Sequence, residues 1–342
     1  YLKETFLSVA VLAGVGLMFI AAKAVLQRMF TVFSLILATG IAVISVFCLP
    51  QAFSSGFIWT FGTAGISRAN AIFSIAILAP WAFVGFEITS FETAHFDFPV
   101  RKSGKIIVTS IIIATMAYIS MTLISVASVP DGFSSWMDYI AGLDGLKGID
   151  SVPTFHVARS VMGKAGLILM TVTAVSAIMT GIIGGYRATT RVLSTMAEDR
   201  ILSEKFSSTT YSILFIMAIA IALSLFGRNT LIWFVDLTSF GAIVGFGYTS
   251  AAAYKIARME GNNRVMITGM TGAAISVIFA IVQMVPRILA METMGSEAFL
   301  LLSLWCLLGF VFYWRTVIRS TLTEYSGLSA SGIVLFALLL YS

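Results

Sequence analysis

The sequence predicts an all-α polytopic membrane protein, and three observations support this prediction. Of its 342 residues, 58% are apolar and only 11% are charged, whereas a soluble globular chain is about 45–50% apolar and about 25% charged. The mean hydropathy is +0.98. Apolar stretches of about 20 residues, the length that one membrane span needs, alternate with short charged segments. This composition excludes a disordered chain, a coiled coil and an ordinary soluble enzyme.

The apolar stretches predict helices, because the alternating segments of about ten residues that transmembrane strands show do not occur in the sequence. We expect membrane spans at 5–22, 28–49, 69–95, 104–127, 165–193, 211–227, 231–256, 266–286, 297–316 and 326–342. Together they would form one transmembrane domain, 1–342, integral to the cell membrane. Both ends of the chain lie in or beside apolar runs, so we expect it to be a fragment of a longer protein.

The basic residues predict the orientation of the chain. Cytoplasmic loops carry an excess of Lys and Arg, and the 21 basic residues divide 14 to 7 between the two sets of loops. The larger set, expected in the cytoplasm, is Lys23, Arg28, Arg101, Lys102, Lys105, Arg187, Arg191, Arg200, Lys205, Lys255, Arg258, Arg264, Arg315 and Arg319. Topology then explains the net charge of +5, and nucleic acid is not expected as a partner. The segment 128–164 becomes an external loop, with Trp136 and Tyr139 expected at the membrane interface.

One predicted span, 69–95, contains residues that disfavour a continuous helix. Pro80 lacks a backbone donor and clashes with the preceding turn, and Gly85 can adopt backbone angles closed to other residues. Glu87 follows, and an intramembrane carboxylate is costly enough to suggest a function. We therefore expect two half-helices that are separated near 82–85. The alternative is a proline kink in which Glu87 pairs with a neighbouring helix.

Three motifs resemble those of the amino acid–polyamine–organocation (APC) permeases. The segment 83–87, Phe-Val-Gly-Phe-Glu, is similar to the signature of the family's sixth helix, and the basic exit at 98–102 is similar to the cytoplasmic loop that follows it. The segment 191–202 resembles the exit of the eighth helix, and 236–241, Asp-Leu-Thr-Ser-Phe-Gly, resembles the start of the tenth. The motifs occur in the family's order and at its spacing.

The resemblance implies the APC (LeuT-like) inverted-repeat fold. On that basis 5–49 corresponds to helices four and five, 69–256 to helices six to ten, and 266–316 to helices eleven and twelve. The first three helices would be missing, and 326–342 would be a further span or a linker. In such folds a broken helix offers backbone N–H groups and carbonyls to the charged ends of the substrate.

The substrate is accordingly expected at the broken helix, with Glu87 as a protonatable gate. The expected substrate-binding residues there are Trp81, Ala82, Phe83, Val84, Gly85 and Phe86. For Trp81 a packing or interfacial role is the alternative.

Several single polar residues are further candidates. Thr180, Tyr186 and Ser239 lie on predicted spans and could contact the substrate, although Ser and Thr in such helices more often bond their own backbone or a neighbouring helix. Ser34 stands where many family members have a lysine that resembles a fixed replacement for a sodium ion. Ser34 and Thr180 are therefore candidate ion ligands, and coupling to a proton, to sodium or to exchange stays open.

The function expected from these features is secondary active transport, by a permease or exchanger, of an amino acid or related amine by alternating access. No enzyme activity is expected, because the sequence shows no nucleophile–base arrangement and no phosphate-binding loop. No cofactor is expected. No metal is expected either, because no cluster of residues has metal-ligand spacing. The expected partners are the small-molecule substrate, the lipid bilayer and a coupling proton or sodium ion. The alternative is a permease-like amino acid sensor domain of a larger signalling protein, suggested by the apolar segment 327–342.

Overall fold

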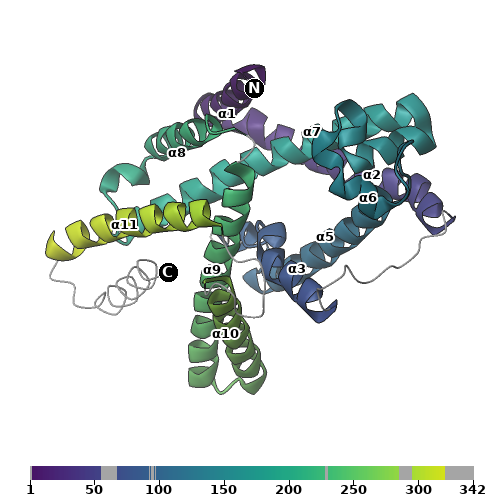
Figure 1. Ribbon diagram of the computed structural model, residues 1–342. Helices are drawn as coiled ribbons and strands as arrows, with labels where there is room; N and C mark the ends of the chain where they lie inside the picture. Colours follow the sequence, from purple (N-terminus) through teal and green to yellow (C-terminus); the bar gives the residue numbers. More distant parts are fainter. Residues whose placement is uncertain are drawn as a thin grey trace.

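The computed structural model describes residues 2–54, 68–91, 98–227, 230–284 and 295–319, together with 93 and 96 (Figure 1). In these ranges the regular structure is helical and there is no strand. The α-helices are α1 (Leu2–Ala21), α2 (Lys23–Ser54), α3 (Arg68–Phe83), α4 (Ile88–Phe91), α5 (Ser103–Ser125), α6 (Trp136–Ala141), α7 (Pro153–Glu198), α8 (Thr209–Ser224), α9 (Thr230–Glu260), α10 (Asn263–Met284) and α11 (Ser296–Arg319).

The all-helical prediction is confirmed for the described part of the chain. Six helices there are long and apolar enough to cross a membrane: Glu4–Ala21, Lys23–Ser54, Val100–Ser125, Pro153–Glu198, Leu231–Glu260 and Asn263–Met284. By length and composition they are the helices of a multi-pass membrane protein. Each predicted span from 5–22 to 297–316 overlaps a described helix, whereas 326–342 lies outside the described residues.

Helix α7 begins at Pro153, before the predicted span 165–193, and consists of two helical segments that meet at Gly163. Pro153 suits the first turn of a helix, where its missing N–H would have no partner. Gly163 interrupts α7 with φ 61° and ψ −141°, angles that glycine adopts at little cost. The segment of α7 after Gly163 therefore agrees with the predicted span 165–193, and the segment before it is a helix within the predicted external loop 128–164.

The helices pack through three separate cores. The first joins α2, α5 and α7 and contains Ile44, Cys48, Ile124 and Val157, all of which are 0% exposed. The second joins α1, α7 and α8, and α1 lies beside α8 in Figure 1. The third joins α9, α10 and α11 around Phe240. Each core lies on one side of its helices, and the outward faces remain apolar.

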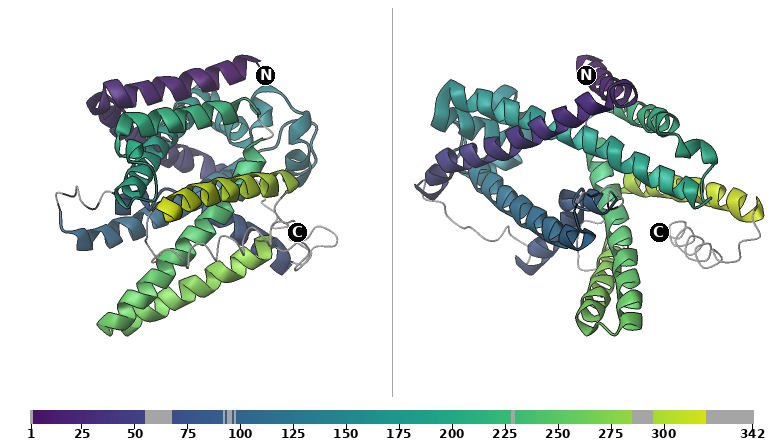
Figure 2. Two further views of the ribbon diagram at one scale, coloured as in Figure 1. Left: turned by 90° about the vertical axis from the view of Figure 1, so that its left-hand side faces the viewer. Right: turned by 180° about the vertical axis from the view of Figure 1, so that it is seen from behind.

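The α9–α10 hairpin packs through small residues. A Cβ on Gly269 of α10 would lie 2.7 Å from the Tyr254 amide nitrogen of α9, and one on Gly247 of α9 would lie 3.0 Å from Ser276 Cβ. Small side chains let two helix backbones approach closely. The hairpin extends away from α7, and the beginning of α11 lies beside the N-terminal half of α9 (Figures 1 and 2).

The outward faces of the described helices expose large apolar side chains, which require an apolar environment. Leu35 on α2, Ile113 on α5 and Ile278 on α10 are among many large apolar side chains that lie exposed. Soluble monomers rarely expose contiguous apolar surface on this scale, and lipid would cover it. The helix packings do not show the inverted-repeat arrangement of the APC fold, which stays a prediction.

Candidate functional site

The predicted interruption in the span 69–95 is present. Helix α3 ends at Phe83, α4 begins at Ile88, and the residues between them form a turn. The turn is closed by bonds over three residues: the Val84 amide donates to the Trp81 carbonyl and the Ile88 amide to the Gly85 carbonyl, both at 3.2 Å. The predicted interruption of the helix is confirmed, with the turn at 84–87 rather than near 82–85, and the helix that follows it, α4, has four residues.

Gly85 rather than Pro80 determines where the helix stops. Pro80 lies inside α3, before its end at Phe83. Gly85 has φ +128°, a value that a residue with a Cβ rarely adopts. The chain therefore passes Pro80 as a helix and departs from helical geometry at the glycine, which explains why the interruption begins later in the chain than expected.

The Glu87 side chain folds back onto this turn. Its Oε2 atom accepts a hydrogen bond from the Gly85 amide at 2.8 Å, and the Ser90 hydroxyl donates to the Glu87 carbonyl at 2.6 Å. The carboxylate thus satisfies one amide that the missing helical turn would have used. Among the described residues no protein acceptor is found for the amides of Phe86 and Glu87, so the turn presents two free donors.

Aromatic residues of two other helices flank the turn. On the α5 side, the Tyr118 hydroxyl donates to the Ala82 carbonyl, and its ring lies 5.5 Å from that of Phe83 in an edge-on arrangement. On the α9 side, Phe246 stacks on Phe86 at 5.4 Å. The interruption is therefore held between α5 and α9, and a movement of either helix would change its geometry.

The remaining predicted residues of the turn region are open to the outside. Trp81 is 46% exposed and Val84 is 44% exposed. A Cβ on Gly85 would meet no atom within 4 Å. The indole of Trp81 is therefore not packed into a core of the described helices, and the space around Gly85 is unfilled.

Tyr186 lies away from the interruption. Its hydroxyl donates to the Leu12 carbonyl of α1 at 3.0 Å, its ring lies 6.4 Å from that of Phe19, and it is 3% exposed. Its polar end therefore joins α7 to α1. The structure does not bring it together with the residues at 81–87.

Ser34 and Thr180 are bonded within their own helices. The Ser34 hydroxyl donates to the Phe30 carbonyl at 2.7 Å, and the Thr180 hydroxyl donates to the Ser176 carbonyl at 2.9 Å. Helices α2, α4 and α7 meet near Gly184, where an added Cβ would lie 3.7 Å from an Ile88 methyl and 4.0 Å from the Phe30 ring. Thr180 precedes Gly184 by one helical turn, and Ser34 follows Phe30 by one turn, so both lie close to this meeting point. Their role as ion ligands stays a prediction.

Ser239 belongs to a second polar cluster, on α9 and α10. Its Oγ atom is buried and has no hydrogen-bond partner in the described part of the chain, and the same is true of Gln283 Oε1. The Gln283 Nε2 atom donates to the Asp236 carbonyl at 3.3 Å, and the Gly295 amide donates to Asp236 Oδ2 at 3.3 Å. The sequence analysis did not identify Gln283, because one amide side chain in an apolar run has no motif.

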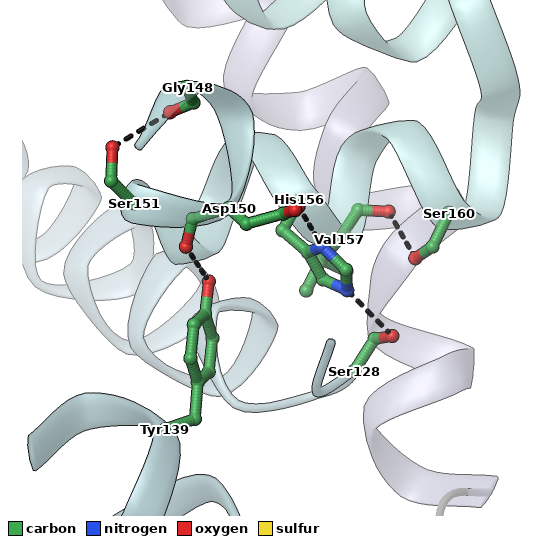
Figure 3. Close-up of polar contacts among 8 residues, drawn as sticks. All are labelled: Ser128, Tyr139, Gly148, Asp150, Ser151, His156, Val157 and Ser160. Carbon is green, nitrogen blue, oxygen red and sulfur yellow. Dashed lines mark hydrogen bonds and ion pairs between the residues drawn. The ribbon is translucent and has the colours of Figure 1, made fainter. Parts of the chain in front are cut away.

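A third group, missed by sequence reasoning, joins the α5–α7 connection to α7 (Figure 3). His156 Nδ1 lies 2.8 Å from Asp150 Oδ1, and Ser128 Oγ lies 3.4 Å from His156 Nε2. Serine, histidine and carboxylate follow one another here in the order of a nucleophile, its base and the group that orients the base. The Ser128–His156 distance is longer than the about 2.6–3.2 Å typical of a nucleophile and its base. These contacts hold the α5–α7 connection against α7, and Ser128, Asp150 and His156 are called the latch below.

Tyr139 completes this latch. Its hydroxyl donates to the Asp150 carbonyl at 2.7 Å, and its side chain is 0% exposed. Burial, and then the neighbouring Asp150 carboxylate, raise the pKa of the Tyr139 phenol above its ordinary value of 10.0. The side chain of Tyr139 is enclosed by protein, and its position at the membrane interface stays a prediction.

A cavity between described helices lies away from the interruption. A volume of about 820 Å³ between α1, α7, α8 and the start of α9 is lined mainly by apolar side chains, among them Val11, Met179, Leu223 and Phe234. Glu4 is the charged residue in its wall. None of the predicted substrate-binding residues lines this cavity, so it is not evidence for a substrate site at the interruption.

In comparisons with known proteins, no family model matches the chain, and no curated protein is similar to it. The resemblance to the APC permeases therefore rests on the motifs alone.

Proposed function

We propose that the chain is part of a secondary transporter that moves an amino acid or related amine across the cell membrane. The single observation that supports this most is the interrupted helix at Val84–Glu87, within an apolar span, with Gly85 at φ +128°. Irregular backbone at membrane depth is tolerated only where it is buried in protein or lines a water-filled cavity. The exposed turn at 84–87 therefore suits a water-filled cavity that a substrate could enter.

The chemistry of the turn suits a zwitterion. The free amides of Phe86 and Glu87 can donate to a carboxylate, and the carbonyls at the end of α3 can accept from an ammonium group. Ala82, Phe83, Val84 and Gly85 contribute backbone to this surface, and Trp81 contributes an exposed ring. No cofactor is part of the proposal.

Glu87 is proposed as the gate. Its carboxylate holds the turn through the Gly85 amide, and protonation would weaken that bond, since a neutral acid is a poorer acceptor than a carboxylate. The turn would then be free to rearrange as the site opens to one side of the membrane or the other. Transport and the charge state of Glu87 would be linked in this way.

The test is uptake of radiolabelled amino acids into proteoliposomes that contain the complete protein. Gly85→Ala is expected to reduce uptake at least tenfold, because a Cβ is strained at this φ. Gly181→Ala is the matched control, since Gly181 also has open space around it but lies within α7. Equal uptake by the two variants would contradict the proposal. Binding of the amino acid without any uptake would favour the sensor instead.

A further inference from the structure

Two buried side-chain oxygens on α9 and α10 have no partner among the described residues: Ser239 Oγ and Gln283 Oε1. Ser239 is 0% exposed and Gln283 is 4% exposed. Buried polar groups are almost always hydrogen-bonded, and a genuine exception often marks the place of a bound water or ion. Two such oxygens in one small region require an explanation.

The two oxygens accompany the half-buried carboxylate of Asp236 on α9. Asp236 lies three residues before Ser239 on α9, so the two side chains project from the same face of the helix. Gln283 of α10 reaches this position, because its Nε2 atom donates to the Asp236 carbonyl at 3.3 Å. The Asp236 carboxylate itself accepts the Gly295 amide at 3.3 Å. One backbone amide does not neutralise a charge in an apolar environment.

We propose that Asp236, Ser239 and Gln283 bind a sodium ion between α9 and α10. The carboxylate, hydroxyl and amide oxygens are hard ligands, which suit a hard cation and not a soft transition metal. A single carboxylate balances a single positive charge, whereas protein sites for Ca²⁺ offer more oxygen ligands and often several carboxylates. An ion at this position would satisfy both unpartnered oxygens and the carboxylate together.

The position of the site suggests how the ion acts on the interrupted helix. Phe246, which stacks on Phe86 of the turn, lies seven residues after Ser239, two helical turns along the same face of α9. Binding at Ser239 would therefore hold the helix that flanks the interruption. The binding of sodium does not depend on the proposed transport function; its role as the coupling ion rests on that function.

The binding test uses thermal unfolding of the purified full chain in detergent, without amino acid. Sodium chloride replaces choline chloride at constant total salt, because a ligand that binds only the folded state raises the unfolding temperature as its concentration increases. The wild type is expected to rise by about 3–5 °C. Ser239→Ala should need at least tenfold more sodium for the same rise, and Asp236→Asn should not respond. Ser303→Ala is the matched control and should respond like the wild type, since its hydroxyl donates to the Phe299 carbonyl within α11.

Equilibrium binding of radioactive sodium to the wild type gives a second measurement that does not depend on whether Asp236→Asn folds. Saturable binding that is weakened in Ser239→Ala and retained in Ser303→Ala supports the site. An unfolding temperature that is equal in sodium and choline, or a Ser239→Ala variant that binds like the wild type, overturns it. Either of these results would refute the sodium site but not the proposed function, which the uptake of amino acids tests independently.

Discussion

The Glu87 carboxylate accepts a hydrogen bond from the Gly85 amide at 2.8 Å, across the turn that separates α3 from α4. The two residues have complementary parts in the interruption. Gly85 provides backbone angles that end the helix, and Glu87 satisfies one of the amides that the ended helix leaves free. This geometry supports a gate at Glu87, because the same bond that stabilises the turn depends on the charge of the carboxylate.

Glu87→Gln is expected to abolish the pH dependence of transport and to leave substrate binding largely unchanged. Glutamine retains an oxygen that can accept from the Gly85 amide, but it cannot change charge. Uptake and binding are measured in proteoliposomes across about pH 5–8. Glu198→Gln, at an exposed position at the end of α7, is the control and should keep the wild-type profile. A folded Glu87→Gln protein with an unchanged profile would remove Glu87 from the mechanism.

Tyr186→Phe is expected to lower stability without changing substrate affinity. The substitution removes the hydrogen bond to the Leu12 carbonyl, which is worth about 1 kcal/mol, and keeps the buried ring. Thermal unfolding should show a decrease of a few degrees, and amino acid binding should stay within twofold of the wild type. A tenfold loss of affinity at unchanged stability would instead support a direct substrate contact by the hydroxyl.

The buried Tyr139 phenol predicts a loss of stability at alkaline pH. Its pKa is raised in the folded protein, so the folded state holds the proton more tightly than the unfolded state. The contribution is present below about pH 10 and is lost as the pH rises through the folded pKa. Tyr139→Phe should be less stable at neutral pH, because it lacks the bond to the Asp150 carbonyl, but its stability should fall less above about pH 10. Parallel pH curves for the two proteins would contradict this account.

The charge distribution predicts that Lys102 and Lys147 lie on opposite sides of the membrane. Both side chains are exposed, so a cysteine at either position is accessible to an impermeant thiol reagent. Cys48 and Cys306 are replaced by alanine first. In right-side-out vesicles Lys147→Cys should be labelled and Lys102→Cys should be protected. Labelling of both from one side would refute the orientation.

The helices and the interruption could be predicted from sequence because their causes are local. Apolar runs of sufficient length determine most of the helices, and Gly85 with Glu87 indicates the turn. The short helical segment of α7 before Gly163 could not be predicted in this way, since the residues near Pro153 form no long apolar run. The contacts of Tyr186 with Leu12 and of Ser128 with His156 join residues 174 and 28 positions apart. No local pattern encodes such pairs, so the second polar cluster and the latch could be found only in three dimensions.

The most direct measurement of the central claim is the reaction of a cysteine introduced at position 84 with a water-soluble thiol reagent. Val84 is exposed and lies in the turn, so Val84→Cys in the otherwise cysteine-free protein should react, and a transported amino acid should slow the reaction at least fivefold. Ile113→Cys, on the exposed apolar face of α5, should stay unreactive in the membrane. If the thiol of Val84→Cys does not react, or reacts at the same rate with and without the amino acid, the interruption is not the substrate site.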